Sequence, residues 1–187
     1  MPVVRSTGTC TSWMPPLFGH ISTPPALAGP ALSGGEAQNE ALGRSQGGFS
    51  TKLHLRAEGG GKPIIAVLTG GERHEQMALE DLLEGGAIRR SGRGRPRLRP
   101  HRLAGDKGYS SPTARRRLRR RRISPVIPSR RNERPQPTFD RDAYRERNKV
   151  ERLINRLKQS RRIATRYEKR AANYLAMITI AMVMLWL

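Results

Sequence analysis

The chain has 187 residues, of which 36% are hydrophobic and 5% aromatic, and its formal net charge is +21. Residues 1–86 carry 6 Lys and Arg against 8 Asp and Glu, whereas residues 87–187 carry 30 against 7. The length suits one domain, and an excess of arginine confined to one half indicates a polyanionic partner such as nucleic acid.

The cysteine content and the hydropathy pattern further narrow the class of protein. The single cysteine, Cys10, excludes an intrachain disulfide and a cysteine-based zinc site, which suits the reducing cytoplasm. The apolar run 174–187 has 14 residues, fewer than the roughly 20 of a membrane-spanning helix, so we expect a buried core helix and no membrane partner. Prolines interrupt the first 25 residues, so no signal peptide is predicted.

The N-terminal part changes character near residue 42. Residues 1–41 are rich in Pro, Gly, Ser and Thr without sustained periodicity, so we expect them to be mostly unstructured, apart from a weak strand signal at 3–7. Residues 49–56 alternate between apolar and polar side chains and predict a half-buried strand. The glycine-rich segment 58–63 predicts a turn, and the β-branched run 64–69 a more buried strand, so together they form a hairpin.

The second half alternates helix and strand signals. Residues 74–85 predict a helix that buries Met77, Ala78, Leu82 and Leu83 and ends at Gly85. The later expected elements are a basic loop at 89–100, a strand at 101–106, a helix at 111–122 that Ser110 or Ser111 caps and Pro112 begins, a strand at 123–128, a loop at 129–140, and helices at 140–162 and 168–187. This order predicts an α/β layered domain with a mixed sheet.

One helical segment, YRERNKVERLINRLK (144–158), holds an isolated carboxylate among cations. At about 100° per residue, Tyr144, Arg147, Glu151 and Lys158 fall within an arc of roughly 60°. The apolar stripe lies beside this arc, so Glu151 sits at its border. Glu151 could ligate a divalent metal while the cations hold phosphate, or it could pair with Arg147 on a solvated face.

A second carboxylate, Asp106, ends the short strand 101–106. Carboxyl ends of strands are common ligand sites in α/β folds, although an Asp at this place often serves only as a turn or capping residue. Two isolated acids at such points of an arginine-rich chain favour a shared site.

These residues carry a family resemblance. The segment DKGY (106–109), together with Tyr144, Arg147, Glu151 and Lys158 separated by two, three and six residues, resembles the insertion-sequence transposases with a DDE catalytic domain. Segments 43–55, 127–132 and 161–169 are also similar to that family, so the resemblance covers residues 42–187.

The resemblance implies a ribonuclease H-like fold that cuts and rejoins double-stranded DNA by phosphoryl transfer with Mg²⁺ or Mn²⁺. Asp106 and Glu151 would be the second and third acidic metal ligands. The implied DNA contacts are Tyr144, Arg147, Lys158, Lys107, Arg161 and Arg162. The seven arginines within 115–122 would follow the phosphate backbone. The implied location is the cytoplasm, in association with the nucleoid, and the implied assembly a homodimer.

The first acid of the family pattern is missing. No Asp precedes Asp81, and Glu36 and Glu40 lie in a glycine-rich context that we do not expect to hold a metal. We therefore expect residues 1–41 to be an out-of-frame segment, the first strand to be absent, and a sheet edge beside 49–56 to be exposed. The sequence thus predicts a partial catalytic domain, 42–187, that binds DNA without sequence preference and is inactive alone.

Two other functions fit parts of the sequence. A non-catalytic basic nucleic-acid-binding protein would explain the arginines, but it does not require the spacing at 144–158. Attachment to a membrane surface is weaker, because the basic helices lack an apolar face rich in aromatic residues.

Overall fold

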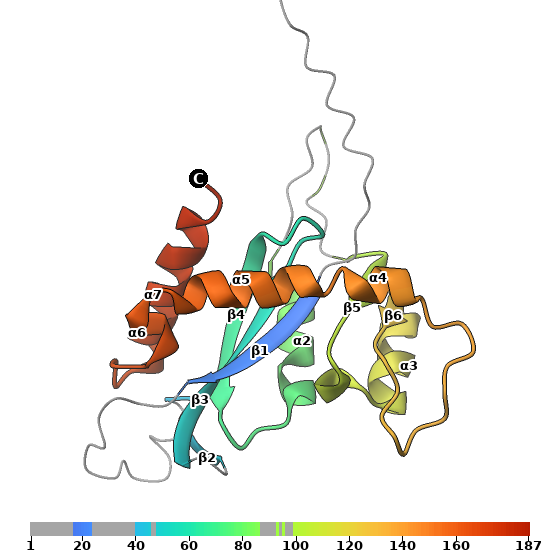
Figure 1. The fold of residues 1–187 in the computed structure, drawn as a ribbon, viewed down its shortest axis with the longest axis horizontal. Coiled ribbons are helices and arrows are strands. Elements are labelled where there is room, and N and C mark those ends of the chain that lie inside the picture. Colours follow the sequence, from blue (N-terminus) through green and yellow to red (C-terminus); the bar gives the residue numbers. More distant parts are fainter. Residues whose placement is uncertain (1–16, 24–39, 46–47, 87–92, 94, 96–98) are drawn as a thin grey trace, which may run out of the picture.

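The computed structural model describes residues 17–23, 40–45, 48–86, 93, 95 and 99–187, and these form a mixed sheet between two layers of helices (Figure 1). The strands are β1 (Leu17–Thr23), β2 (Gly43–Ser45), β3 (Gly48–Ala57), β4 (Pro63–Gly70), β5 (Arg102–Ala104) and β6 (Ser124–Val126). The helices are η1 (Glu75–Ala78), α2 (Leu79–Glu84), η2 (Lys107–Tyr109), α3 (Pro112–Arg120), α4 (Arg141–Arg145), α5 (Asn148–Lys158), α6 (Arg161–Ala164) and α7 (Ala171–Met184). The predicted α/β architecture with a mixed sheet is confirmed.

The sheet is antiparallel on one side and parallel on the other. β3 pairs antiparallel with both β4 and β1, and β2 pairs with the start of β3. β1 then pairs in parallel with β5, and β5 in parallel with β6. β1 is therefore the strand that joins the two halves of the sheet.

The presence of β1 corrects the prediction that the first strand is absent. Its residues pair with Thr51–Ala57 of β3, so this edge of β3 is covered, not exposed. The segment escaped prediction because it has only seven residues and prolines lie on both sides of it. The backbone groups of β3 nevertheless need partners, and a short extended segment supplies them. The weak strand signal at 3–7 lies outside the described residues.

β3 is buried on both faces, which corrects the prediction of a half-buried strand. Leu53 and Leu55 pack in the core under α5, while the polar side chains of the other face lie beneath η1 and α2. Arg56 is 1% exposed and donates hydrogen bonds to the carbonyls of Leu82 (3.1 Å) and Gly85 (3.0 Å), at the carboxyl end of α2. Its burial lowers the pKa of Arg56.

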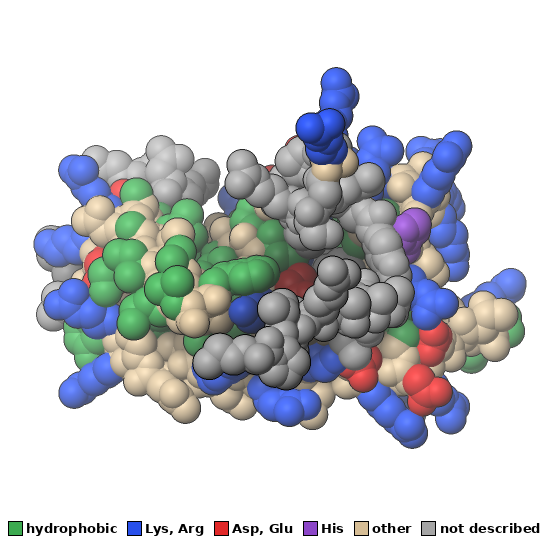
Figure 2. All heavy atoms as spheres, turned by 90° about the horizontal axis from the view of Figure 1, so that it is seen from above, with side chains coloured by type: hydrophobic (Ala, Val, Ile, Leu, Met, Phe, Trp, Pro, Cys, Tyr) green, Lys and Arg blue, Asp and Glu red, His purple; other side chains and the backbone are tan. Residues whose placement is uncertain are grey.

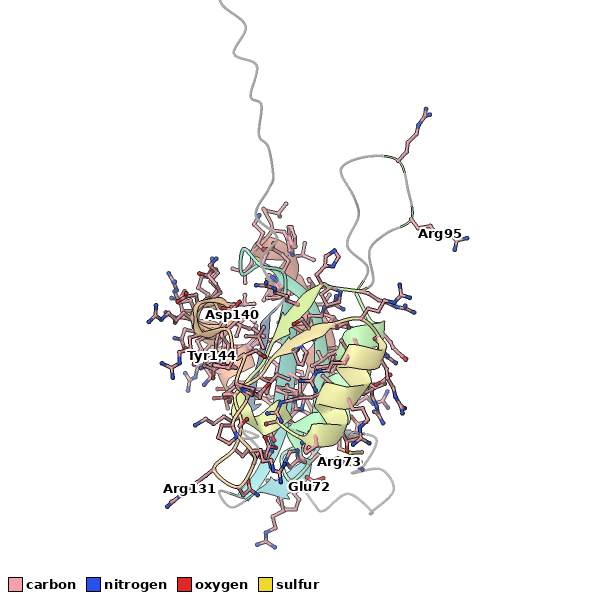
Figure 3. The ribbon with its side chains drawn as sticks, turned by 90° about the vertical axis from the view of Figure 1, so that its right-hand side faces the viewer. Glu72, Arg73, Arg95, Arg131, Asp140 and Tyr144 are labelled. Atoms are coloured by element: carbon pink, nitrogen blue, oxygen red, sulfur yellow. The ribbon has the colours of Figure 1, made fainter. Side chains whose placement is uncertain are left out.

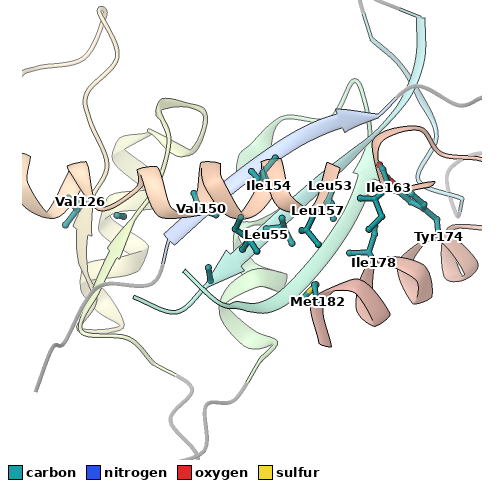
Figure 4. Packing of buried hydrophobic residues seen from close by; sticks show 13 residues of the cluster. Leu53, Leu55, Val126, Val150, Ile154, Leu157, Ile163, Tyr174, Ile178 and Met182 are labelled. Carbon is teal, nitrogen blue, oxygen red and sulfur yellow. The ribbon is translucent and has the colours of Figure 1, made fainter. Parts of the chain in front are cut away.

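Two hydrophobic clusters hold the helices to opposite faces of the sheet. α5 and α7 contribute Leu153, Leu157 and Ile178 to the first cluster, which includes Leu53 and Leu55 (Figure 4). The second cluster joins α2 and α3 to β5 through three buried leucines, Leu82, Leu118 and Leu103. Figure 3 looks along the sheet and shows α4 on one side of it and α3 on the other.

The β3–β4 hairpin and α3 agree with prediction. The turn after β3 closes through a hydrogen bond from the Glu58 N–H to the Lys62 carbonyl, and Gly61 adopts φ +90° there. At the start of α3, the Ser111 hydroxyl accepts the Ala114 N–H at 3.0 Å, and Pro112 occupies the first turn.

The helix predicted at 74–85 is partly a 3₁₀ turn. η1 precedes α2, which ends at Gly85 as predicted. Ala78, Leu82 and Leu83 are buried, but Met77 is 60% exposed, so its place in the predicted core was wrong. A 3₁₀ turn advances more per residue than an α-helix, which rotates Met77 away from the buried face.

The helix predicted at 140–162 is divided into α4, α5 and α6. At the first break the Arg147 N–H donates to the Tyr144 carbonyl and the Val150 N–H to the Arg147 carbonyl, each at 3.0 Å and three residues apart. This tight junction rotates Tyr144 relative to the rest of the predicted face. The second break falls at Ser160, which precedes α6.

α7 is buried along one stripe only, which corrects the prediction of a buried helix at 168–187. Tyr174, Ile178 and Met182 face the core, whereas Ile180 and Met184 are more than half exposed. Hydrophobic side chains gather over α7 on the left of Figure 2. Within the described ranges, every helix is too short or too polar to cross a membrane.

Candidate active site

Asp106 follows β5 and caps the short helix η2. One carboxylate oxygen accepts the Lys107 N–H at 2.7 Å, and the side chain is half-buried. The capping role that the sequence left open is therefore present. The second oxygen makes no hydrogen bond within the described part of the chain, so the cap does not use up the carboxylate.

The turn that carries Asp106 is held from two sides. Arg130, in the loop after β6, donates to the carbonyls of Lys107 (3.2 Å) and Gly108 (3.0 Å). Beneath the turn, the buried Tyr109 hydroxyl lies 3.0 Å from Nδ1 of His54 on β3. Burial raises the pKa of Tyr109, and the negative charges of Glu75 and Asp106 raise it further.

The second acid, Glu151, lies on the first turn of α5. Arg147 donates to its carboxylate at 2.7 Å, as the alternative of a paired surface acid predicts. The Glu151 side chain is 49% exposed and that of Arg147 is 20% exposed. The guanidinium also lies 5.4 Å from the ring centre of Tyr144, which packs against Phe139. In Figure 3, Tyr144 lies on the side of the sheet away from α3.

Asp106 and Glu151 act on the same guanidinium. Burial alone would lower the pKa of Arg147, but the carboxylates of Glu151 and Asp106, and the Tyr144 phenol once it ionises at alkaline pH, outweigh it, so the pKa of Arg147 is raised. α5 packs on β1, and β1 pairs with β5, whose end leads into Asp106. The elements that carry the two predicted acids are thus separated by one strand, β1.

The other residues predicted to contact DNA are exposed and make no ion pair with Asp106 or Glu151. Lys107 is exposed beside Asp106. Lys158 is exposed at the end of α5, about 10 Å along the helix from Glu151. Arg161 and Arg162 are exposed on α6. These four cations form no ion pair in the part of the chain that the structure describes.

A third ligand for a metal is not in place. Among the described residues there is no group of three or more His, Cys, Asp or Glu side chains that could hold a metal ion. β1 is the neighbour of β5 and reads LFGHIST, without an acidic residue. Two carboxylates alone would leave most ligand positions of a divalent ion to waters or phosphate oxygens, and they do not supply a ligand set for two ions.

Sequence reasoning missed the network that joins the Asp106 turn to α3. Glu133 accepts a hydrogen bond from the Ser110 hydroxyl at 2.6 Å and pairs with the buried Arg115 at 2.9 Å. Burial would raise the pKa of Glu133, but its bonds from Ser110, Arg115 and the Arg130 N–H outweigh that and lower it. The similarity of segment 127–132 to the family pointed to this region. The contacts of Glu133 with Ser110 and Arg115 could not be predicted, because contacts between distant residues leave no periodic pattern in the sequence.

The arginine run of α3 divides into two sets, which corrects the expectation that all seven follow a phosphate backbone. Arg115 is buried, and Arg117 and Arg121 pair with Glu80 on α2. The exposed set, which forms no ion pair with any described residue, consists of Arg116, Arg119, Arg120 and Arg122.

The site defines an arginine-rich α/β domain in which Arg147 pairs with Glu151 on α5 and Asp106 follows the parallel strand β5. The chain belongs to the transposase DDE domain family, whose model matches residues 34–186. It is 36% identical over 121 residues to the transposase assigned to insertion sequence element IS402 of Burkholderia cepacia, which covers 65% of this chain and 55% of the relative.

A second relative matches a shorter stretch. The chain is 41% identical over 51 residues to the transposase assigned to insertion sequence element IS6501 of Brucella ovis, which covers 27% of this chain and 39% of the relative. The chain thus spans about half the length, or less, of these curated relatives.

Proposed function

We propose that this chain is the part of a DNA transposase that holds Asp106 and Glu151 as metal ligands and places them at a phosphodiester bond of double-stranded DNA. The observation that carries the proposal is the placement of α5, whose Glu151 pairs with Arg147 at 2.7 Å, on β1, the strand beside β5 and Asp106. A simple DNA-binding module has no need to bring two acids together inside a basic surface, because their charge opposes DNA binding.

The order of the strands supports a ribonuclease H-like fold. The order β4-β3-β1-β5-β6, with antiparallel pairing on one side of β1 and parallel pairing on the other, places the end of β5 next to the central strand. In open α/β sheets, ligand sites gather at the carboxyl ends of parallel strands. Asp106 follows β5 at this end, and α5, which carries Glu151, packs on the neighbouring strand β1.

A bound Mg²⁺ or Mn²⁺ would supply charge stabilisation at the phosphate and a more acidic attacking oxygen. Asp106 and Glu151 would hold it. Arg147 keeps Glu151 oriented and, with Lys158, presents cationic groups to phosphate oxygens. Lys107, Arg161 and Arg162 extend this basic surface, and the Tyr144 ring fixes the Arg147 guanidinium from one side.

Two carboxylates limit the activity of the chain. Because β1 carries no acid, a second divalent ion lacks its ligands among the described residues. We therefore propose that the chain alone binds DNA, and associates with the nucleoid for that reason, but does not cut it. We further propose that residues 1–41 are an out-of-frame segment. Translation of the nucleotide sequence upstream of codon 42 in the other two frames tests this, because the proposal requires that another frame encode an acid-bearing strand, whose place β1 takes in this chain.

Comparison of Glu151→Gln with the unchanged chain tests the metal site. We expect wild type to bind Mn²⁺ measurably by calorimetry and Glu151→Gln to bind it at least tenfold more weakly. The matched control is Glu146→Gln, because Glu146 also pairs with a cation, Lys149, three residues away at the same junction. Equal Mn²⁺ binding by wild type and Glu151→Gln would favour the non-catalytic nucleic-acid-binding alternative.

Cleavage of a labelled duplex with Mg²⁺ tests the activity separately. We expect no strand cleavage by the purified chain. Mg²⁺-dependent cleavage that Glu151→Gln abolishes would support the site and overturn the proposed inactivity.

A further inference from the structure

A cleft of about 770 Å³ lies between α3 and the loop that follows β6, apart from the Asp106–Glu151 site. Five arginines and one glutamate line it, together with Pro112 and two side-chain amides. The glutamate, Glu133, is already paired with Arg115 and bonded to Ser110, so its charge is compensated inside the protein. The cleft therefore presents a strong surplus of positive charge.

One wall of the cleft is the exposed face of α3. Arg116, Arg119 and Arg120 are spaced three and four residues apart, which places them on one side of the helix, within an arc of about 100°. Leu118 fixes the opposite side of α3 in the core, and Arg115, at the edge of the exposed face, is paired with Glu133. The helix is thus anchored without these three guanidinium groups, and no described acid neutralises them.

The facing wall comes from the loop after β6. Arg134 and Asn132 line this wall, both exposed. Gln136 secures the loop by donating to the Ile127 carbonyl at 2.7 Å. Figure 3 looks onto this end of the molecule, with the loop carrying Arg131 on one side and α3 on the other. Two walls with the same charge repel each other, so an anion between them would stabilise the cleft.

We propose that this cleft binds the phosphate backbone of double-stranded DNA, as a second contact beside the carboxylate site. This inference rests on the proposed function. Guanidinium groups bind phosphate through paired hydrogen bonds. Arg116 and Arg120 are separated by about 6 Å along the helix axis, while phosphates of one strand rise by about 3.4 Å each, so the face spans neighbouring phosphates.

The composition of the cleft favours duplex DNA over two other polyanions. Single-stranded nucleic acid is usually held by aromatic side chains that stack on bases, and no aromatic residue lines the cleft in the described structure. Membrane surfaces attract helices that also expose apolar side chains, and none of the exposed large hydrophobic residues within the described ranges lines it.

The cleft is linked to the carboxylate site through the loop. Arg130 holds the Asp106 turn, while the next residues of the same loop, from Asn132 to Gln136, form the cleft wall. Glu133 reaches Ser110, immediately after the turn. A duplex gripped in the cleft would therefore be held by the same loop that positions Asp106.

Fluorescence anisotropy of the full chain with a labelled 20-bp duplex tests the proposal. We expect the triple variant Arg116→Ala/Arg119→Ala/Arg120→Ala to bind at least tenfold more weakly at 0.1 M salt. Its plot of log affinity against log salt should be shallower by about two to three, one unit for each lost phosphate contact. The charge-matched control is Lys62→Ala/Lys169→Ala/Arg170→Ala, which removes three exposed cations near α7, at the opposite end of the molecule (Figure 1). It should change affinity less than threefold.

A replacement variant and further binding measurements make the outcome of the test unambiguous. If the triple variant does not fold, as judged by circular dichroism, the loop variant Arg134→Ala replaces it and should weaken binding at least threefold. Tighter binding of single-stranded DNA, or binding of anionic vesicles that the triple variant loses, would overturn the assignment to duplex DNA. Equal losses in the triple variant and its control would also overturn it, while wild-type DNA binding would leave the proposed function standing. Absence of DNA binding by wild type would overturn both.

Discussion

Arg147 and Glu151 form an ion pair of 2.7 Å at the junction of α4 and α5, and the charge of Asp106 reaches the same guanidinium. The pair matches one of the two roles that the sequence left open for Glu151, and the metal-binding role stays a prediction. A guanidinium that orients a carboxylate also competes with a metal ion for it. Under the proposed function, Arg147 would bind phosphate when DNA is present and hold Glu151 when it is not.

Replacement of Arg147 should separate these effects. In Arg147→Ala, we expect Mn²⁺ to bind about two- to fivefold more tightly, because the partly exposed ion pair that competes with it, worth up to about 1 kcal/mol, is lost. Duplex DNA should bind more weakly in the same variant. Calorimetry and anisotropy measure the two affinities. Arg145→Ala, which removes a pair with Asp142 on the exposed side of α4, is the control and should leave Mn²⁺ binding unchanged. A fall in Mn²⁺ affinity in Arg147→Ala would contradict the competition.

The buried pair of Glu133 and Arg115 should contribute to the stability of the domain. Glu133→Gln leaves the Arg115 charge buried with a neutral partner, so we expect the free energy of unfolding to fall by about 2–4 kcal/mol. Urea denaturation measures this change. Glu84→Gln removes a more exposed partner of Arg121 and should cost less than about 1 kcal/mol. Equal costs for the two variants would show that the Glu133 pair behaves as a surface pair.

Local sequence patterns predicted the elements whose turn, capping and periodicity signals lie within one stretch of the chain. The β3–β4 hairpin and α3 carry their own turn glycines, cap and proline. β1 could not be predicted, because its stability comes from pairing with β3 and β5 and not from its seven residues. The two faces of β3 show the same limit, since alternation cannot reveal that Lys52, His54 and Arg56 find partners under a second layer of helices.

The candidate site divides in a similar way. The spacing around Glu151 predicted its pairing with Arg147, because both lie within about one helical turn. The predicted grouping with Asp106 needed the family resemblance, since the 44 intervening positions carry no period. Arg130 and Glu133 were missed because their partners are backbone carbonyls and a buried arginine, which leave no trace in local sequence.

Arg166 should be a structural requirement within the segment 161–169. It is 1% exposed and donates to the carbonyls of Glu40 (2.8 Å) and Lys169 (2.7 Å) and to the Thr51 hydroxyl (2.6 Å). An ammonium group cannot reproduce this planar set of bonds, so Arg166→Lys should lower the free energy of unfolding by about 2–4 kcal/mol. Arg162→Lys, at an exposed position, should change it by less than about 0.5 kcal/mol. Chemical denaturation compares the two variants. An Arg166→Lys chain as stable as wild type would contradict the structural role of the Arg166 guanidinium.

Tyr109 should make the stability of the domain fall in alkaline solution. Burial raises the pKa of Tyr109, with Glu75 and Asp106 adding to the effect, so the folded state keeps a proton that the unfolded chain loses near the ordinary tyrosine value of about 10. Its contribution is therefore complete below about pH 10 and declines above it, by up to about 1.4 kcal/mol per pH unit. Tyr109→Phe should be less stable at pH 8, because the bond to His54 is lost, yet its stability should fall less steeply between pH 10 and 11.5. Tyr167→Phe, at a side chain that is 37% exposed, should keep the wild-type slope. Urea unfolding at a series of pH values measures all three chains, and equal slopes for wild type and Tyr109→Phe would show that the phenol ionises without cost in the folded protein.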